Sequence, residues 1–99
     1  MAAERPSERL AIAGSGAIAC GLARAAGGRL PALEVTVWAR SERSAATAEE
    51  RLRGVATVVT DLDALAGATV VVEAVAEDQA VKAELLGRLG AMLAEEALL

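Results

Sequence analysis

Four short apolar runs divide the chain into segments of different character. They cover residues 10–13, 34–38, 55–60 and 69–75, and their length and β-branched content predict strands. The run at 34–38 alternates between polar and apolar residues, whereas the run at 69–75 is apolar on both faces. A strand that is apolar on both faces is typical of a parallel sheet that is covered on both sides.

Two helices are predicted between the first three runs. The first covers residues 16–26, and Gly27–Gly28 would end it. The second covers residues 44–53, which are charged and rich in alanine. Thr47 stands three residues before Glu50 there, which is the spacing of a capping box.

Two further helices are predicted in the second half of the chain. Asp61 can cap a short helix that ends at Gly67. From Asp78 onward, the apolar residues fall on one stripe of a longer helix, and these are Val81, Leu85, Leu89, Met92 and Leu93. The last residues, 97–99, are suited to open a fifth strand.

Strands and helices therefore alternate along the chain, which predicts an α/β fold with a parallel sheet and right-handed crossovers. We assign residues 9–99 to a partial Rossmann-type domain: a doubly wound parallel sheet in three α/β/α layers, with its first four strands present and its C-terminal part incomplete. Residues 1–8 are polar and are expected to form a disordered leader. In such a sheet the first and fourth strands flank the reversal of strand order, where a ligand is expected.

A glycine-rich turn stands between the first strand and the first helix. Residues 14–19 read Gly-Ser-Gly-Ala-Ile-Ala and fit the dinucleotide-binding pattern G-x-G-x-x-(G/A). The first glycine permits a tight turn, the second lets the backbone approach a pyrophosphate, and the final alanine permits close packing of helix on strand. A plain small-residue connection is the alternative, but the strand–helix–strand context favours a nucleotide. The residues expected to hold it are Gly14, Ser15, Gly16, Ala17 and Ile18.

The end of the second strand bears on the choice of cofactor. A carboxylate that holds the ribose usually stands about 20 residues after the glycine turn, but this chain has Ala39 there. Alanine does not repel a 2′-phosphate, and Arg40, Ser41 and Arg43 offer two cations and a hydroxyl to it. We therefore expect these four residues to contact the cofactor, and NADP(H) to be preferred over NAD(H). The alternative is that the two arginines form a solvated surface beside Glu42.

Composition and charge narrow the range of partners. The net charge is −4 and the isoelectric point is near 4.8, which argues against nucleic acid or an anionic membrane as the main binding partner. The N-terminus does not resemble a secretory signal, and the longest apolar run is far shorter than the ~20 residues of a membrane span. Cys20, the single cysteine, is expected to be a small buried apolar residue and excludes an internal disulfide. We expect a cytoplasmic protein.

A more specific pattern lies in residues 73–82, which read EAVAEDQAVK. Together with GSGAIACGLA at residues 14–23, this run resembles the 3-hydroxyacyl-CoA dehydrogenase family. The turn departs from the family pattern G-x-G-x-x-G-x-G-I-A at Ala19 and Leu22. The resemblance covers nearly everything from Leu10 onward.

The resemblance implies roles for two more residues. In the family, the second Glu and the Lys of this run contact the cofactor near its nicotinamide, and they correspond to Glu77 and Lys82. Without the resemblance, Glu77 would complement a helix N-terminus and Lys82 would pair with Asp78 on a helix surface. The family typically has Asp where Ala39 stands and typically uses NAD, so the expected preference for NADP(H) is a departure.

Catalysis in the family needs a histidine that abstracts the hydroxyl proton, and this chain contains neither histidine nor tyrosine. We therefore predict no catalytic residue and no metal site in it. The favoured interpretation is the dinucleotide-binding N-terminal part of a 3-hydroxyacyl-CoA dehydrogenase of fatty acid metabolism, which a missing C-terminal domain or a second copy would complete. The alternatives are an NADP-dependent reductase of the glycerol-3-phosphate or β-hydroxyacid dehydrogenase type, and a non-catalytic nucleotide-binding module.

Overall fold

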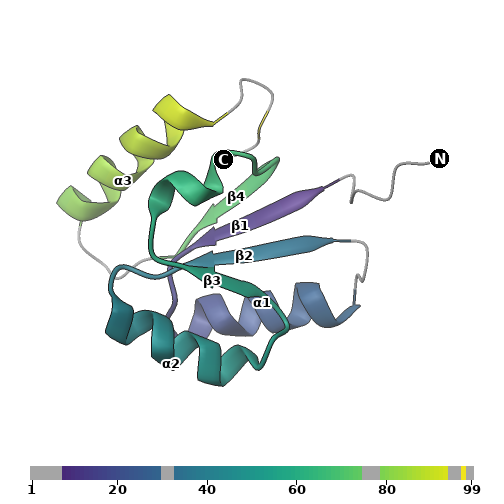
Figure 1. Ribbon diagram of the computed structural model, residues 1–99. Helices are drawn as coiled ribbons and strands as arrows, with labels where there is room; N and C mark the ends of the chain where they lie inside the picture. The colour runs from purple at the N-terminus through teal and green to yellow at the C-terminus, as the bar shows by residue number, and fades with distance from the viewer. Residues whose placement is uncertain (1–7, 30–32, 75–78, 94–96, 98–99) are drawn as a thin grey trace.

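A computed structural model describes residues 8–29, 33–74, 79–93 and 97. It shows one four-stranded sheet with helices on both faces (Figure 1). The elements in chain order are β1 (Arg9–Ala13), α1 (Ala17–Arg29), β2 (Glu34–Trp38), α2 (Glu42–Leu52), β3 (Thr57–Val59), the 3₁₀ helix η1 (Leu62–Leu65), β4 (Val70–Glu73) and α3 (Gln79–Met92). No described helix is long and apolar enough to cross a membrane.

All strand pairs in the sheet are parallel, and the strand order is β3-β2-β1-β4. The central strand β1 pairs with β2 on one side and with β4 on the other, so that Ile12 stands opposite both Val37 and Val72. The chain reverses direction across the sheet after β3, when it returns to place β4 beside β1. The predicted α/β fold with a doubly wound parallel sheet is confirmed.

Each face of the sheet has its own hydrophobic core. On the face that α1 and α2 cover, the buried residues are Ile12, Ala19, Cys20, Ala23, Val35, Val37, Ala48 and Leu52. On the face that η1 and α3 cover, they are Ala11, Ala13, Leu62, Leu65, Ala68, Val71, Leu85 and Leu89. Successive side chains of a strand point to opposite faces, so β1 contributes to both cores. The predicted apolar stripe of the last helix is confirmed for Leu85, Leu89, Met92 and Leu93, whereas Val81 belongs to neither core.

Helix α1 does not stop at its glycine pair, and the predicted end there is wrong. The helix continues through Gly27 to Arg29. A Cβ atom on Gly27 would lie 2.7 Å from Cγ1 and 2.8 Å from the carbonyl oxygen of Val55, which precedes β3. This glycine therefore allows the helix to approach a distant part of the backbone, rather than ending the helix.

Helix α2 begins two residues earlier than predicted, and the capping box at Thr47 is wrong. The N-cap is Ser41, whose Oγ accepts a hydrogen bond of 3.1 Å from the backbone N–H of Ser44. Thr47 lies inside the helix and donates its hydroxyl to the carbonyl of Arg43 at 3.3 Å. Ser41 and Thr47 both have the side chain of an N-cap residue, and Ser41, which is nearer to β2, caps the helix.

The later elements agree with the prediction in position and differ in length. Strands β3 and β4 are shorter than the apolar runs that predicted them. Asp61 caps η1 as predicted, because its Oδ1 accepts a 3.0 Å hydrogen bond from the N–H of Asp63. Residues 1–7 of the predicted leader and the last two residues of the suggested fifth strand lie outside the described residues. Glu8, the last residue of the predicted leader, is described, and its Oε1 accepts a 2.7 Å hydrogen bond from the Thr69 hydroxyl.

Replacing Gly27 with alanine should lower the free energy of unfolding by about 1–3 kcal/mol, because the new methyl group overlaps the Val55 backbone. Urea denaturation would measure the change. Gly21→Ala is the matched control in the same helix, where a Cβ meets nothing within 4 Å. That variant should gain about 0.5–1 kcal/mol from the better helix propensity of alanine. Equal gains for both variants would contradict a packing role for Gly27.

Candidate functional site

Three backbone hydrogen bonds hold the loops at the carboxyl edge of the sheet close to one another. The N–H of Gly14 donates to the carbonyl of Trp38 at 3.0 Å, and the N–H of Ala74 donates to the carbonyl of Ala13 at 2.9 Å. The N–H of Ala39 donates to the carbonyl of Val59, also at 2.9 Å. These bonds continue the strand pairing one residue beyond the strands, so the segments that follow β1, β2 and β4 begin side by side.

The glycine turn between β1 and α1 has a conformation that suits few other residues. Gly14 has a φ of 148°, in the region that favours glycine. Gly16 is exposed, and a Cβ built on it would meet nothing within 4 Å. The packing of the protein therefore does not require a glycine at position 16, and the space in front of this backbone is open to a ligand.

The first turn of α1 presents its backbone amides at the same place. The first helical hydrogen bond runs from the N–H of Cys20 to the carbonyl of Gly16 at 2.9 Å. The N–H groups of Ala17, Ile18 and Ala19 therefore have no acceptor within the helix. This turn contains no acidic residue. Free amides and the helix dipole together make such a terminus a binding site for phosphate groups.

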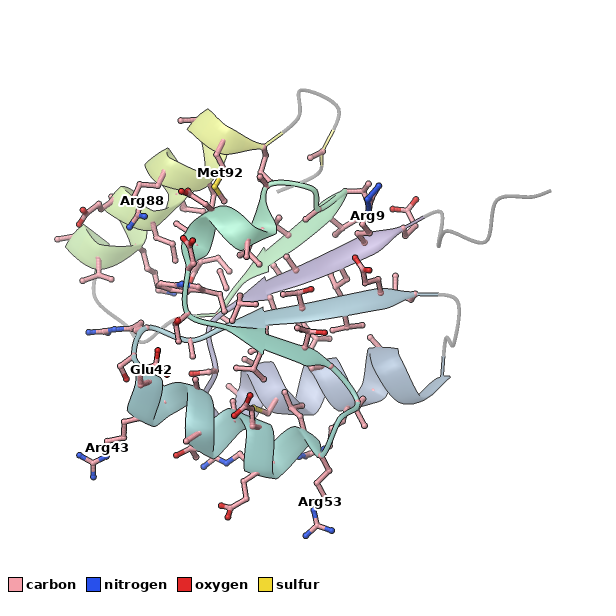
Figure 2. All side chains as sticks on the ribbon, in the orientation of Figure 1. Arg9, Glu42, Arg43, Arg53, Arg88 and Met92 are labelled. Carbon is pink, nitrogen blue, oxygen red and sulfur yellow. The ribbon has the colours of Figure 1, made fainter. Side chains whose placement is uncertain are left out.

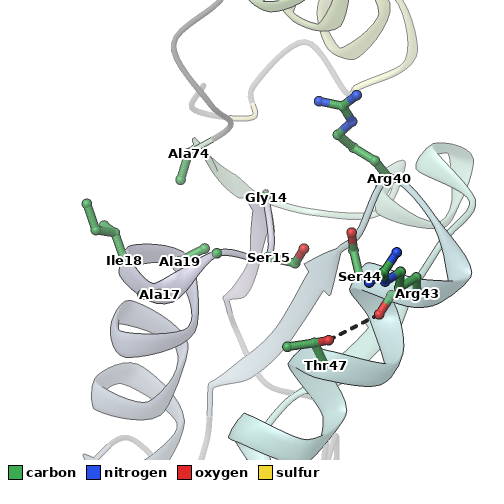
Figure 3. A pocket seen from close by; sticks show the side chains of 11 residues that line it. Gly14, Ser15, Ala17, Ile18, Ala19, Arg40, Arg43, Ser44, Thr47 and Ala74 are labelled. Carbon is green, nitrogen blue, oxygen red and sulfur yellow. Dashed lines mark hydrogen bonds between the residues drawn. The ribbon is translucent and has the colours of Figure 1, made fainter.

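A pocket of about 710 Å³ opens in front of this turn (Figure 3). The residues that line it are Gly14, Ser15, Gly16, Ala17, Ile18, Ala19, Arg40, Arg43, Ser44, Thr47 and Ala74. This lining contains two arginines, three hydroxyl side chains and no carboxylate. Such a wall suits an anionic ligand that carries more than one phosphate.

Most of the residues expected to hold the cofactor line this pocket, namely Gly14, Ser15, Gly16, Ala17, Ile18, Arg40 and Arg43. Ala39 is fully buried beneath the pocket. Ser41 uses its side chain to cap α2, and its hydroxyl donates to Oγ of Ser44 at 3.1 Å. Lys82 lies on α3 and pairs with Glu73 at 3.5 Å. Glu77 lies outside the described residues.

The prediction missed Ser44, Thr47 and Ala74 as lining residues. Arg43, Ser44 and Thr47 are spaced as one face of a helix, and this spacing would have identified Ser44 and Thr47 once Ser41 was taken as the N-cap. Ala74 comes from the fourth strand, and its position depends on the pairing of β4 with β1. No local pattern marks it as a site residue.

Arg40 stands between two cavities. It is exposed at the rim of the main pocket, where its side chain extends away from Ser44 and Thr47 (Figure 3). A second cavity of about 140 Å³ is lined by Trp38, Arg40, Val81, Glu84, Leu85 and Arg88. Arg40 therefore lines both cavities, and the wall of the second combines Trp38 and aliphatic residues with the charged Glu84 and Arg88.

Cys20 is fully buried, as predicted, and its Sγ lies 3.4 Å from the carbonyl oxygen of Ser15. It belongs to the core beneath the glycine turn and is closed off from solvent. Within the described part of the chain, no group of three or more His, Cys, Asp or Glu side chains is placed to hold a metal ion.

Comparison with known proteins connects this geometry to a family. The model of the 3-hydroxyacyl-CoA dehydrogenase NAD-binding domain matches residues 35–99. No curated protein sequence matches the chain. The glycine turn and α1 precede the matched range, so the evidence for that part of the site is structural.

Solved structures extend the likeness to nearly the whole chain. The chain is 25% identical to 3-hydroxybutyryl-CoA dehydrogenase from Escherichia coli K12, with a TM-score of 0.80 over 92% of this chain and 23% of that one. FadB2 from M. tuberculosis is 26% identical, with a TM-score of 0.79 over 91% and 39%. (S)-3-hydroxybutyryl-CoA dehydrogenase PaaH1 from Ralstonia eutropha is 17% identical and shares the fold, with a TM-score of 0.77 over 91% and 38%.

The chain thus spans less than two fifths of the length of each of these solved structures. The family model matches the chain over residues 35–99, and the solved structures share its fold over about nine tenths of its length. The chain therefore belongs to the 3-hydroxyacyl-CoA dehydrogenase family and lies within its NAD-binding domain, which takes a nicotinamide dinucleotide as cofactor.

Proposed function

We propose that the 710 Å³ pocket binds the cofactor with its diphosphate on the N-terminus of α1, and that it prefers NADP(H) to NAD(H). The observation that carries the preference is the lining beside α2, where two arginines stand and no carboxylate does. The 2′-phosphate of NADP(H) would lie between Arg40 and Ser44. A carboxylate at this place would repel that phosphate, whereas guanidinium groups bind phosphate oxygens with good geometry.

The surrounding charges support this preference. Glu42 stands between the two arginines in sequence, but its Oε2 accepts a 3.5 Å hydrogen bond from the Thr60 hydroxyl, beyond β3. Among the described residues, neither Arg40 nor Arg43 forms a salt bridge with a carboxylate. Their charges are therefore available to a ligand, which argues against the alternative of an arginine surface neutralised by Glu42.

The position of Ala39 supports the same proposal. Its side chain is fully buried and its N–H is bound to Val59, so this residue offers nothing to a ribose hydroxyl. The recognition of the adenosine ribose would then depend on the first turn of α2. Ser44 and Thr47 supply hydroxyl groups there.

We further propose that the complete enzyme transfers hydride between this cofactor and a 3-hydroxyacyl-CoA. Two of the solved relatives are 3-hydroxybutyryl-CoA dehydrogenases, and both have far more chain than the part that matches. The histidine that accepts the proton would come from further polypeptide, because this chain, and therefore any second copy of it, has no histidine. A place in cytoplasmic fatty acid metabolism is part of this proposal and rests on the family alone.

The 99-residue chain alone should therefore bind dinucleotide without oxidising 3-hydroxybutyryl-CoA. A spectrophotometric assay of NADPH and NADH formation, run beside a binding titration of the same sample, measures both properties. Turnover by the chain alone would contradict the proposal that the catalytic residues lie outside it.

Arg40→Asp should abolish the preference for NADP(H). A charge-assisted contact of about 1.5–3 kcal/mol corresponds to a change of about tenfold or more in NADPH affinity. Calorimetric titrations with NADPH and NADH give the ratio of the two affinities. The matched control is Arg53→Asp, which makes the same charge change at the other end of α2 (Figure 2) and should leave the ratio unchanged. An unchanged NADPH affinity in Arg40→Asp would refute the preference.

Gly16→Ala tests the diphosphate site independently of cofactor choice. The new methyl group meets no protein atom within 4 Å, so the thermal unfolding midpoint should remain within the error of the measurement. The methyl group would occupy the space that a diphosphate needs, so both NADPH and NADH should bind about tenfold or more weakly. Full affinity for both cofactors in a folded variant would place the diphosphate elsewhere.

A further inference from the structure

A salt bridge connects the end of β4 to the beginning of α3. The Nζ atom of Lys82 lies 3.5 Å from Oε1 of Glu73. Glu73 is the last residue of β4, and Lys82 lies in the first turns of α3. The Glu73 side chain is 16% exposed and that of Lys82 is 27% exposed, so both are partly withdrawn from solvent and still accessible.

This pair stands beside the dinucleotide pocket. Glu73 is in register with Ala13, the last residue of β1, and the next residue, Ala74, lines the pocket. Ala74 also donates its N–H to the Ala13 carbonyl, which ties the start of the β4–α3 connection to the strand that leads into the glycine turn. The pair therefore lies at the reversal of strand order, next to the proposed diphosphate site.

The location of Lys82 needs a counter-charge. A cation near the N-terminal end of a helix is unfavourable because the helix dipole places partial positive charge there. Helix α3 has no acidic residue in its first turn. The carboxylate of Glu73, supplied by the sheet, compensates for this and limits the positions that the long Lys82 side chain adopts.

The order of strands indicates which part of the cofactor this pair would meet. A dinucleotide runs from adenosine through the diphosphate to the nicotinamide riboside. The carboxyl ends of β2, β1 and β4 follow one another across the sheet in that order. With the adenosine beside Arg40 after β2 and the diphosphate on the turn after β1, the nicotinamide riboside extends toward the end of β4.

We propose that Glu73 is a positioning residue: through its ion pair it holds the ammonium of Lys82, the lysine that the family resemblance places near the nicotinamide, at that end of the pocket. The proposal rests on the function proposed above for the same pocket. Glu73 acts through Lys82, and its effect is confined to ligands that extend as far as β4.

The test compares two ligands of different reach. NADPH spans the whole proposed site, whereas adenosine 2′,5′-bisphosphate lacks the nicotinamide riboside. Glu73→Gln should weaken NADPH binding about tenfold, because the ammonium is no longer held in place. The same variant should bind adenosine 2′,5′-bisphosphate as the unmodified chain does. Glu50→Gln, an equal charge change on the exposed surface of α2, is the control and should change neither affinity.

A double-mutant cycle shows whether Glu73 acts through Lys82. If it does, Lys82→Gln and the double variant should bind NADPH equally weakly, since removing Glu73 matters only while the ammonium is present. Additive losses would overturn the positioning role. So would unchanged NADPH affinity in Glu73→Gln, or an equal loss for both ligands together with a lowered melting temperature. Failure of the unmodified chain to bind either ligand would instead refute the proposed function, and this inference with it.

Discussion

The position of β1 between β2 and β4 is the constraint on which the site depends. A strand in the middle of a parallel sheet uses its backbone groups on both edges, and β1 does so over most of its length. The pairing continues beyond the strand, through the bonds from Gly14 to Trp38 and from Ala74 to Ala13. The glycine turn, the start of α2 and the start of the β4–α3 connection are thereby held within one pocket, although they are far apart in sequence.

The charges around the pocket differ from those of the molecule as a whole. The chain carries a net charge of −4, yet the described pocket lining has two arginines and no acid. The local field at a binding site depends on nearby groups far more than on net charge. The acidic side chains close to the site have other partners, since Glu42 accepts from Thr60 and Glu73 pairs with Lys82. An acidic protein can therefore present an anion site.

Much of the fold was predictable because its signals are local. The apolar runs identified the strands, and Gly14 and Gly16 identified the turn between β1 and α1. The wrong predictions concern residues whose roles depend on distant partners. Gly27 was taken for a helix end because its contact with Val55 is invisible in the local pattern.

Two contacts near the candidate site were not predicted. The ion pair of Lys82 with Glu73 joins residues of different elements, so helical spacing does not indicate it, and Asp78, the partner that helical spacing suggested, lies outside the described residues. Ser41, which was expected to contact the cofactor, also caps α2. Ser44 and Thr47 then take the place beside the pocket that was expected for Ser41.

The surface position of the pocket wall formed by residues 40–47 bears on how cofactor preference could change during evolution. Arg40 lies just before α2, and Arg43, Ser44 and Thr47 lie in its first two turns; none of them belongs to either hydrophobic core. Mutations in this short stretch cost little packing energy. Under the cofactor preference proposed above, selection could move a protein of this kind between the catabolic and biosynthetic pools of reducing equivalents without redesigning its interior.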